Sequence, residues 1–103
     1  MSAIKVTKDN FDSVLTSQVP VLMDFWAPWC GPCRMISPVV EGIAEEMGEK
    51  VVVGKINVDE QPELASRFGV MSIPTLAVFK EGRLAGSMVG VRPKQEILKL
   101  LEA

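Results

Sequence analysis

Residues Val21 to Cys33 read VLMDFWAPWCGPC, and this run decides how the chain folds. Its first seven residues are almost all apolar, which is typical of a β-strand buried on both faces. From Pro32 to Met47 the apolar residues form one stripe at helical spacing, which predicts a long helix. The cysteines of the run, Cys30 and Cys33, therefore lie where a buried strand ends and a helix begins. In an open α/β sheet, active sites usually lie at the edge formed by the carboxyl ends of the strands.

Extended and helical patterns alternate along the rest of the chain. Strands are predicted at residues 3–6, 21–27, 51–58, 75–80 and 84–89, and helices at 9–17, 32–47, 61–68 and from Pro93 onward. Pro38 lies inside the long helix and should kink it. Helices between apolar strands predict an α/β protein with a mixed sheet covered on both faces, and 103 residues suit one domain spanning 1–103.

The composition excludes several classes of function. The 11 basic and 13 acidic residues are mixed and contain no basic run, which argues against nucleic-acid and membrane-surface binding. No apolar run is long enough to cross a bilayer. The chain has no histidine and two cysteines, too few for Ser-His-Asp catalysis or a four-ligand zinc site, so no metal is expected. Because no secretory signal is visible, we expect a cytoplasmic protein, or one of an organelle stroma or matrix after removal of a transit peptide.

The Cys30-Gly31-Pro32-Cys33 motif is suited to reversible disulfide chemistry. Residues three apart at a helix start share a face, so the two sulfurs can meet. The loop they close is so short that the bond restrains the unfolded chain by only about 2 kcal/mol. Helix N-terminal N–H groups favour a thiolate at Cys30, which we predict to be the nucleophile, with Cys33 as the resolving thiol. Pro32 suits a first helical turn, and Gly31 lets a substrate backbone approach.

A C-x-x-C motif alone leaves other functions open. The two cysteines could form half of a metal site, bind an iron–sulfur cluster between two chains, or stay unpaired. A redox pair could also serve an oxidant or isomerase in an oxidising compartment. A third alternative is a redox-independent subunit that binds a larger enzyme.

The run from Val21 to Cys33 resembles the active-site segment of the thioredoxin family. Three more segments of the chain resemble other segments of this family, in the family's order and spacing: residues 55–59 (KINVD), 72–76 (SIPTL) and 79–82 (FKEG). The resemblance implies a central five-stranded mixed β-sheet flanked by four α-helices, the thioredoxin fold, and a general protein-disulfide reductase. It implies no cofactor beyond a redox-active disulfide between Cys30 and Cys33. Its partners would be disulfide-containing proteins and a separate electron donor of the thioredoxin reductase type, and we expect a monomer.

Two charged residues in the buried strands are further candidates. Asp24 lies in an apolar strand; from pattern alone it is equally a solvent-facing residue or a buried carboxyl whose raised pKa suits proton transfer. The resemblance implies that Asp24 helps to deprotonate Cys33. It also implies that Lys55 approaches Asp24 and tunes its charge, the alternative being a lysine at a solvated edge.

Pro74 begins a predicted strand, where an ordinary proline would be trans, since only about one X-Pro bond in twenty is cis. The resemblance implies instead a cis Ile73-Pro74 bond beside Cys30, whose backbone pairs with an extended substrate strand. It further implies a flat apolar substrate-binding surface around Cys30, formed by Trp29, Gly31, Pro32, Ile73, Pro74 and Gly90.

Overall fold

A computed structural model describes residues 2–103. The elements follow one another as β1 (Ile4–Lys5), α1 (Phe11–Leu15), β2 (Val21–Trp26), α2 (Gly31–Met47), β3 (Val52–Asn57), α3 (Pro62–Arg67), β4 (Thr75–Lys80), β5 (Arg83–Val89) and α4 (Lys94–Glu102), with a short 3₁₀ turn, Gly48–Lys50, directly after α2. Within the described residues, no helix has both the length and the apolar character needed to cross a bilayer.

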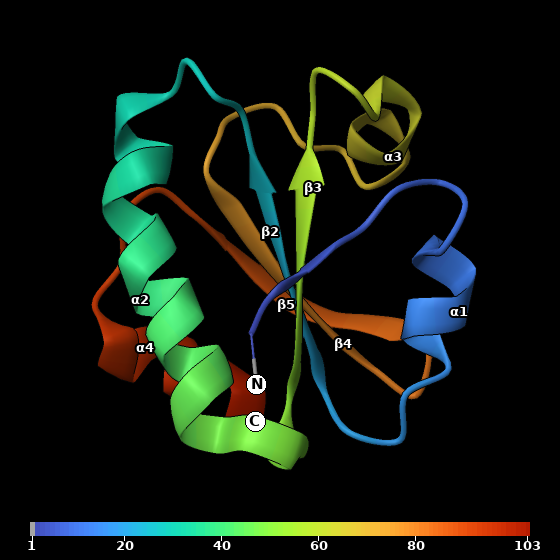
Figure 1. The fold of residues 1–103 in the computed structure, drawn as a ribbon, viewed down its shortest axis with the longest axis vertical. Coiled ribbons are helices and arrows are strands. Elements are labelled where there is room, and N and C mark those ends of the chain that lie inside the picture. Colours follow the sequence, from blue (N-terminus) through green and yellow to red (C-terminus); the bar gives the residue numbers. More distant parts are fainter. Residues whose placement is uncertain (1) are drawn as a thin grey trace.

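The strands form one sheet in the order β1-β3-β2-β4-β5. Strands β1 and β2 run parallel to β3, whereas β4 is antiparallel to β2 and β5 is antiparallel to β4. Helices α2 and α4 cover one face of the sheet, and α1 and α3 cover the other (Figure 1). The predicted fold class, a five-stranded mixed sheet flanked by four helices, is therefore confirmed.

The apolar run of β2 supplies both cores, because alternate side chains of a strand point to opposite faces. Leu22 packs in the core beneath α2 and α4. Met23 and Phe25 pack in the core beneath α1 and α3. Asp24 lies between them in sequence and so shares the face of Leu22, toward α2. The position of the one carboxylate in this strand follows from that alternation.

The predicted boundaries differ from the structure mainly in the first helix. We predicted residues 9–17, but α1 is only Phe11–Leu15. The Asn10 side chain accepts a hydrogen bond from the Thr7 amide at 2.7 Å, and this turn occupies the residues before the helix. Helix α2, in contrast, continues through Pro38 to Met47. Strand β1 is limited to the two residues that pair with β3.

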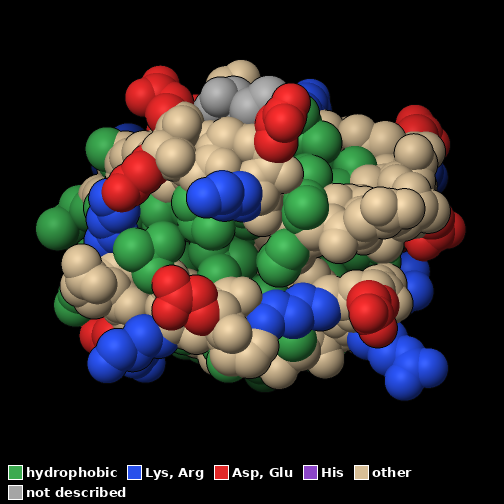
Figure 2. All heavy atoms as spheres, turned by 90° about the horizontal axis from the view of Figure 1, so that it is seen from below, with side chains coloured by type: hydrophobic (Ala, Val, Ile, Leu, Met, Phe, Trp, Pro, Cys, Tyr) green, Lys and Arg blue, Asp and Glu red, His purple; other side chains and the backbone are tan. Residues whose placement is uncertain are grey.

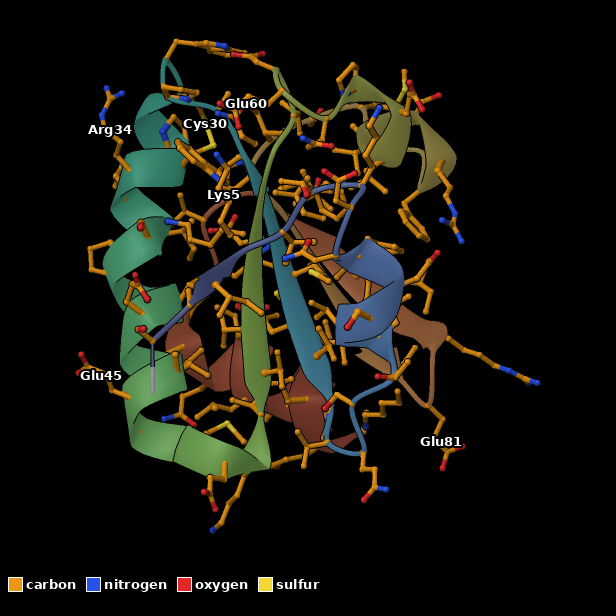
Figure 3. The ribbon with its side chains drawn as sticks, turned by 45° about the vertical axis from the view of Figure 1, so that its right-hand side comes forward. Lys5, Cys30, Arg34, Glu45, Glu60 and Glu81 are labelled. Carbon is orange, nitrogen blue, oxygen red and sulfur yellow. A yellow bond between two sulfur atoms is a disulfide. The ribbon has the colours of Figure 1, made fainter. Side chains whose placement is uncertain are left out.

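The elements place the cysteines at one end of the molecule. Strands β2 and β3 both point toward the end where α2 begins (Figure 1). Figure 3 shows Cys30 at that end, beneath the loop that leaves β2. The opposite end has a central group of apolar side chains with Lys, Arg, Asp and Glu side chains around it (Figure 2). The first end thus combines the carboxyl ends of β2 and β3 with the N-terminus of α2.

Candidate active site

A disulfide joins Cys30 and Cys33 across the first turn of α2, with their Cα atoms 5.2 Å apart. Cys30 is the N-cap residue, with extended backbone angles of φ −90° and ψ 111°. Its Sγ accepts a hydrogen bond from the Cys33 amide at 3.1 Å. One of the unpaired N–H groups at the helix N-terminus thus points at the Cys30 sulfur, where it would stabilise a negative charge.

Both cysteines are nearly enclosed: Cys30 is 5% exposed and Cys33 is 3% exposed. They pack with Ala27 and against Trp26, Val58 and Ile73. In the disulfide state the two are therefore almost equally covered. Their difference is one of position on the helix rather than of exposure.

The Ile73-Pro74 peptide bond is cis, as the family resemblance implies. The Ile73 carbonyl oxygen lies 3.8 Å from the Cys30 sulfur. Gly90 follows β5 with φ +90°, a value that favours glycine, and its amide donates to the Pro74 carbonyl at 2.8 Å. These contacts bring two segments distant in sequence to the same side of the disulfide.

The predicted substrate surface is only partly exposed. Trp29 is 68% exposed, and its indole N–H donates to the Asp59 carboxylate at 2.9 Å. Pro32 is exposed, whereas Gly31, Ile73 and Gly90 are half-buried. Pro74 itself is buried, so it shapes the surface from below rather than forming part of it.

Asp24 is completely buried, which resolves the ambiguity in the strand pattern. Neither carboxylate oxygen has a hydrogen-bond partner among the described residues. Burial raises the pKa of Asp24 to about 6, against the opposing effect of the Lys55 ammonium, and the nearby Glu41 carboxylate adds to the rise. A carboxyl group with this pKa exchanges protons near neutral pH.

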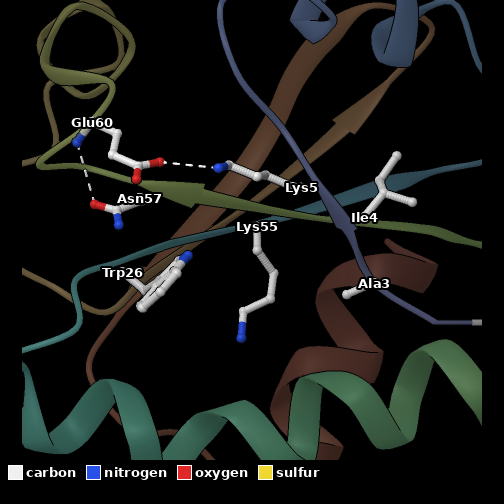
Figure 4. A pocket seen from close by; sticks show the side chains of 7 residues that line it. All are labelled: Ala3, Ile4, Lys5, Trp26, Lys55, Asn57 and Glu60. Carbon is white, nitrogen blue, oxygen red and sulfur yellow. Dashed lines mark hydrogen bonds and ion pairs between the residues drawn. The ribbon is translucent and has the colours of Figure 1, made fainter.

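Lys55 lies next to Asp24 in the sheet, because the two residues are register partners on β3 and β2. Its ammonium donates a hydrogen bond to the Ser37 hydroxyl at 2.8 Å and lies 5.2 Å from the centre of the Trp26 ring. Figure 4 shows the Lys55 side chain extending toward α2. Lys55 lines a hollow with a volume of about 350 Å³. The hollow is lined by Ala3, Ile4, Lys5, Trp26, Lys55, Asn57 and Glu60. Lys55 is therefore half-buried between sheet and helix rather than a fully solvated edge lysine.

Sequence reasoning missed three polar residues of this region: Ser37, Glu41 and Asp59. Ser37 and Glu41 follow Cys33 at intervals of four, which places all three on one side of α2. That spacing was readable from the sequence. The contact of Asp59 with Trp29 depends on the loop after β3, and no local pattern indicates it.

The described residues contain no group of three or more His, Cys, Asp or Glu side chains arranged to hold a metal ion. What the site does contain is a cysteine pair at a helix N-terminus, a cis-proline beside it and a buried carboxyl in the adjoining strand. These features define the class of dithiol–disulfide redox proteins.

Comparison with known proteins gives the particular family. The family model of thioredoxin matches residues 2–103. Thioredoxin from Bacillus subtilis is 50% identical over 101 residues, covering 98% of this chain and 96% of the relative. Thioredoxin 1 from a Nostoc species is 51% identical over 102 residues, covering 98% and 95%. A solved mutant thioredoxin from Halobacterium salinarum superimposes with a TM-score of 0.91 at 39% identity, covering 98% of this chain and 88% of that one. The chain belongs to the thioredoxin family.

The chain is accordingly a thiol–disulfide oxidoreductase that acts as a dithiol–disulfide reductase. Its redox centre is the Cys30–Cys33 disulfide, which is part of the protein itself. The thioredoxin fold and the reductase activity implied by the resemblance are both confirmed.

Proposed function

We propose that Cys30 is the nucleophile that attacks the disulfide of a substrate protein. The observation that carries this assignment is its N-cap position, where its sulfur receives the Cys33 N–H at 3.1 Å. In the reduced protein, the Cys30 thiolate attacks one substrate sulfur, the substrate S–S bond breaks, and the departing thiolate takes up a proton. The product is a mixed disulfide between Cys30 and the substrate.

Cys33 then resolves the mixed disulfide, and Asp24 accepts its proton. The Cys33 thiolate attacks the Cys30 sulfur, closing the Cys30–Cys33 disulfide and releasing the second substrate thiolate, which is protonated. The raised pKa of Asp24 supports this role, because a carboxylate of ordinary pKa is a weaker base toward a thiol. Lys55, the neighbouring cation, tunes the charge of Asp24.

The substrate lies across the surface formed by Trp29, Gly31, Pro32, Ile73 and Gly90, with the buried Pro74 beneath it. The exposed Trp29 ring offers apolar area, and the backbone at the cis bond lies within 4 Å of the attacking sulfur. An extended substrate segment paired with this backbone would present its disulfide to Cys30. The shape favours protein substrates over small molecules held in deep pockets.

Each turnover leaves the protein oxidised, so two electrons and two protons must return. We propose that a separate reductase of the thioredoxin reductase type supplies them, that disulfide-containing proteins consume them, and that the chain acts as a monomer. We place it in the cytoplasm or an organelle stroma, which fits relatives from bacteria and an M-type chloroplastic thioredoxin of Chlamydomonas reinhardtii.

Trapping the mixed disulfide tests the two cysteine roles. The reduced Cys33→Ser variant, mixed with insulin as a disulfide-bonded substrate, should accumulate a covalent adduct through Cys30, detected by non-reducing electrophoresis and mass spectrometry. The matched Cys30→Ser variant should accumulate at least tenfold less, because the helix N-terminus does not activate Cys33 in the same way. Equal trapping by both variants would contradict the assignment. An activity that the Cys30→Ser, Cys33→Ser double variant retains, with neither sulfur present, would support a redox-independent role.

A further inference from the structure

Helix α2 presents a row of polar groups to the sheet directly after the resolving cysteine. Cys33, Ser37 and Glu41 are spaced four apart and share one side of the helix. Ser37 accepts the hydrogen bond from Lys55, and Glu41 is close enough to act on the charge of Asp24. The Glu41 carboxylate also accepts the Ala3 amide at 3.0 Å, which holds it toward the N-terminal segment.

The Lys55 ammonium forms its contacts with the helix and with Trp26 rather than with the carboxylate beside it. It lies 2.8 Å from the Ser37 oxygen and 5.2 Å from the Trp26 ring centre. The ion pairs formed by the described residues do not include one between Lys55 and Asp24, which requires 4.0 Å or less. Asp24 keeps two carboxylate oxygens without a hydrogen-bond partner among those residues. A half-buried cation and a buried carboxyl group are thus neighbours in the sheet but do not form an ion pair.

We propose that Ser37 is a positioning residue for the resolving step, whose hydroxyl holds the Lys55 ammonium against α2 and so keeps Asp24 out of a direct ion pair. The inference rests on the proposed role of Asp24 as proton acceptor for Cys33. An ion-paired carboxylate is a weaker base, because the cation stabilises its charged form. By holding Lys55, Ser37 preserves a basic carboxylate on the face of the sheet covered by the helix that carries the resolving thiol.

The charged groups that face Asp24 indicate in which direction its pKa should change when the Ser37 hydroxyl is removed. Lys55 approaches from β3 and Glu41 from α2, whereas the β4 residue in register with Asp24 is the uncharged Leu76. Cys33 lies on the same side of α2 and does not titrate in the disulfide, and Glu45, four residues beyond Glu41 in the same row, is exposed. If the Ser37 hydroxyl is removed, the Asp24 carboxylate beside Lys55 is an acceptor without a hydrogen-bond partner, whereas the Glu41 carboxylate already accepts the Ala3 amide. Lys55 should then move toward Asp24.

The direct test is the titration of Asp24 in the oxidised protein, followed by the ¹³C chemical shift of its carboxyl group. Ser37→Ala should lower the pKa of Asp24 by about one pH unit. Ser37→Thr keeps the hydroxyl and should leave the pKa of Asp24 near that of the wild type. Ser37→Val has the shape of the Thr variant without its hydroxyl and should lower the pKa as Ala does. Ser66→Ala, on α3 across the sheet, controls for loss of an unrelated serine. An unchanged or raised pKa in both the Ala and the Val variants would overturn the proposal.

A double variant shows whether Ser37 acts through Lys55. Lys55→Met removes the cation and should raise the pKa of Asp24, and adding Ser37→Ala to it should change nothing further. An equal effect of Ser37→Ala with and without Lys55 would also overturn the proposal.

The consequence for the reaction is measured separately. A chromogenic aromatic disulfide releases one thiolate on attack by Cys30 and the second on resolution, so stopped-flow absorbance separates the two steps. Ser37→Ala should leave the first step unchanged and slow the second severalfold at pH 7. If Asp24→Asn leaves the second step unchanged while Ser37→Ala still shifts the Asp24 titration, the proposed role of Asp24 in resolution fails, and Ser37 is shown to position Lys55 without acting on that step. If Asp24→Asn slows the step and Ser37→Ala does not, the positioning role alone fails.

Discussion

The two faces of the sheet are built from the same strands but contain opposite chemistry. On the face under α1 and α3, the rings of Phe11, Phe25, Phe68 and Phe79 pack against one another with centroids 5.3 to 6.4 Å apart. The described residues show no buried side-chain polar atom without a partner on that face. On the face under α2 and α4, a comparable aliphatic core surrounds Asp24 and its two unpartnered oxygens.

This difference separates stability from reactivity. The aromatic face contributes burial and ring contacts, and among the described residues it buries no acidic group; the charged group over its rings is the Arg67 guanidinium. Its contribution to stability should therefore depend little on pH. The opposite face keeps a carboxyl where its ionisation is unfavourable, and that same environment makes it a base of useful strength. A protein of this size can tolerate such a group only if the rest of its core compensates.

The largest expected effect comes from opening the aromatic face. Phe25 is fully buried on β2, beside Asp24 in sequence but on the other side of the sheet. Phe25→Ala should lower the free energy of unfolding by about 3 to 5 kcal/mol, from lost burial and the cavity left behind. Denaturant unfolding of the oxidised protein measures it, with Phe25→Leu as a milder control. A loss under about 1 kcal/mol in the Ala variant would mean that this face is not the main source of stability.

The next effect is the pH dependence that Asp24 introduces. Its pKa of about 6 in the folded protein exceeds the ordinary 3.8, so the folded chain binds this proton more tightly than the unfolded chain. Folding stability is therefore reduced as pH rises from about 4 through 6, and the reduction persists above that range. At about 1.4 kcal/mol per pH unit, the full loss is about 3 kcal/mol.

The Asp24→Asn variant isolates this effect. Wild type and variant, both oxidised, are unfolded with urea at a series of pH values, and the difference between their stabilities is plotted. Between pH 4 and pH 7.5, the free energy of unfolding of the variant should rise relative to that of the wild type by up to about 3 kcal/mol. A difference that stays flat with pH would show that Asp24 is ionised as easily in the folded chain as in the unfolded one.

These two residues also show how far the sequence could predict the structure. The run around Phe25 and Asp24 is apolar at nearly every position because both faces of the sheet are covered, so its pattern contains no marker of which side is solvent. The strand itself was predictable for that reason. The burial of Asp24 was not, since it depends on α2 covering that face.

Other parts of the site required information from distant segments. An isolated X-Pro bond favours trans, and the cis Ile73-Pro74 bond was expected only through family resemblance. The contact between Lys55 and Ser37 joins β3 to α2 and needs the packing of the helix on the sheet. By contrast, the cysteine pair and its place at a helix start followed from local spacing, because both depend on residues within one turn.

The smallest expected effect comes from replacing one glycine on each face with alanine. The two substitutions compare how tightly the two faces are packed. A Cβ on Gly54 would lie 2.6 Å from the Val6 Cγ2 and 2.7 Å from the Met23 Sδ, both in the fully buried core under α1 and α3. A Cβ on Gly86 would meet only the Leu100 side chain on α4, at 2.7 Å from its Cδ1. Leu100 is half-buried, and its terminal methyl group can rotate away.

Gly54→Ala should therefore lower the free energy of unfolding by about 1 to 3 kcal/mol through overpacking, seen as a lower Tm in the oxidised protein. Gly86→Ala should change it by less than about 1 kcal/mol, because relief of the contact needs only one partly exposed side chain to move. Neither position lies in the redox site, so the rate of insulin reduction below the Tm should remain that of the wild type. Equal losses from the two substitutions would show that the two faces are packed equally tightly and differ only in charge.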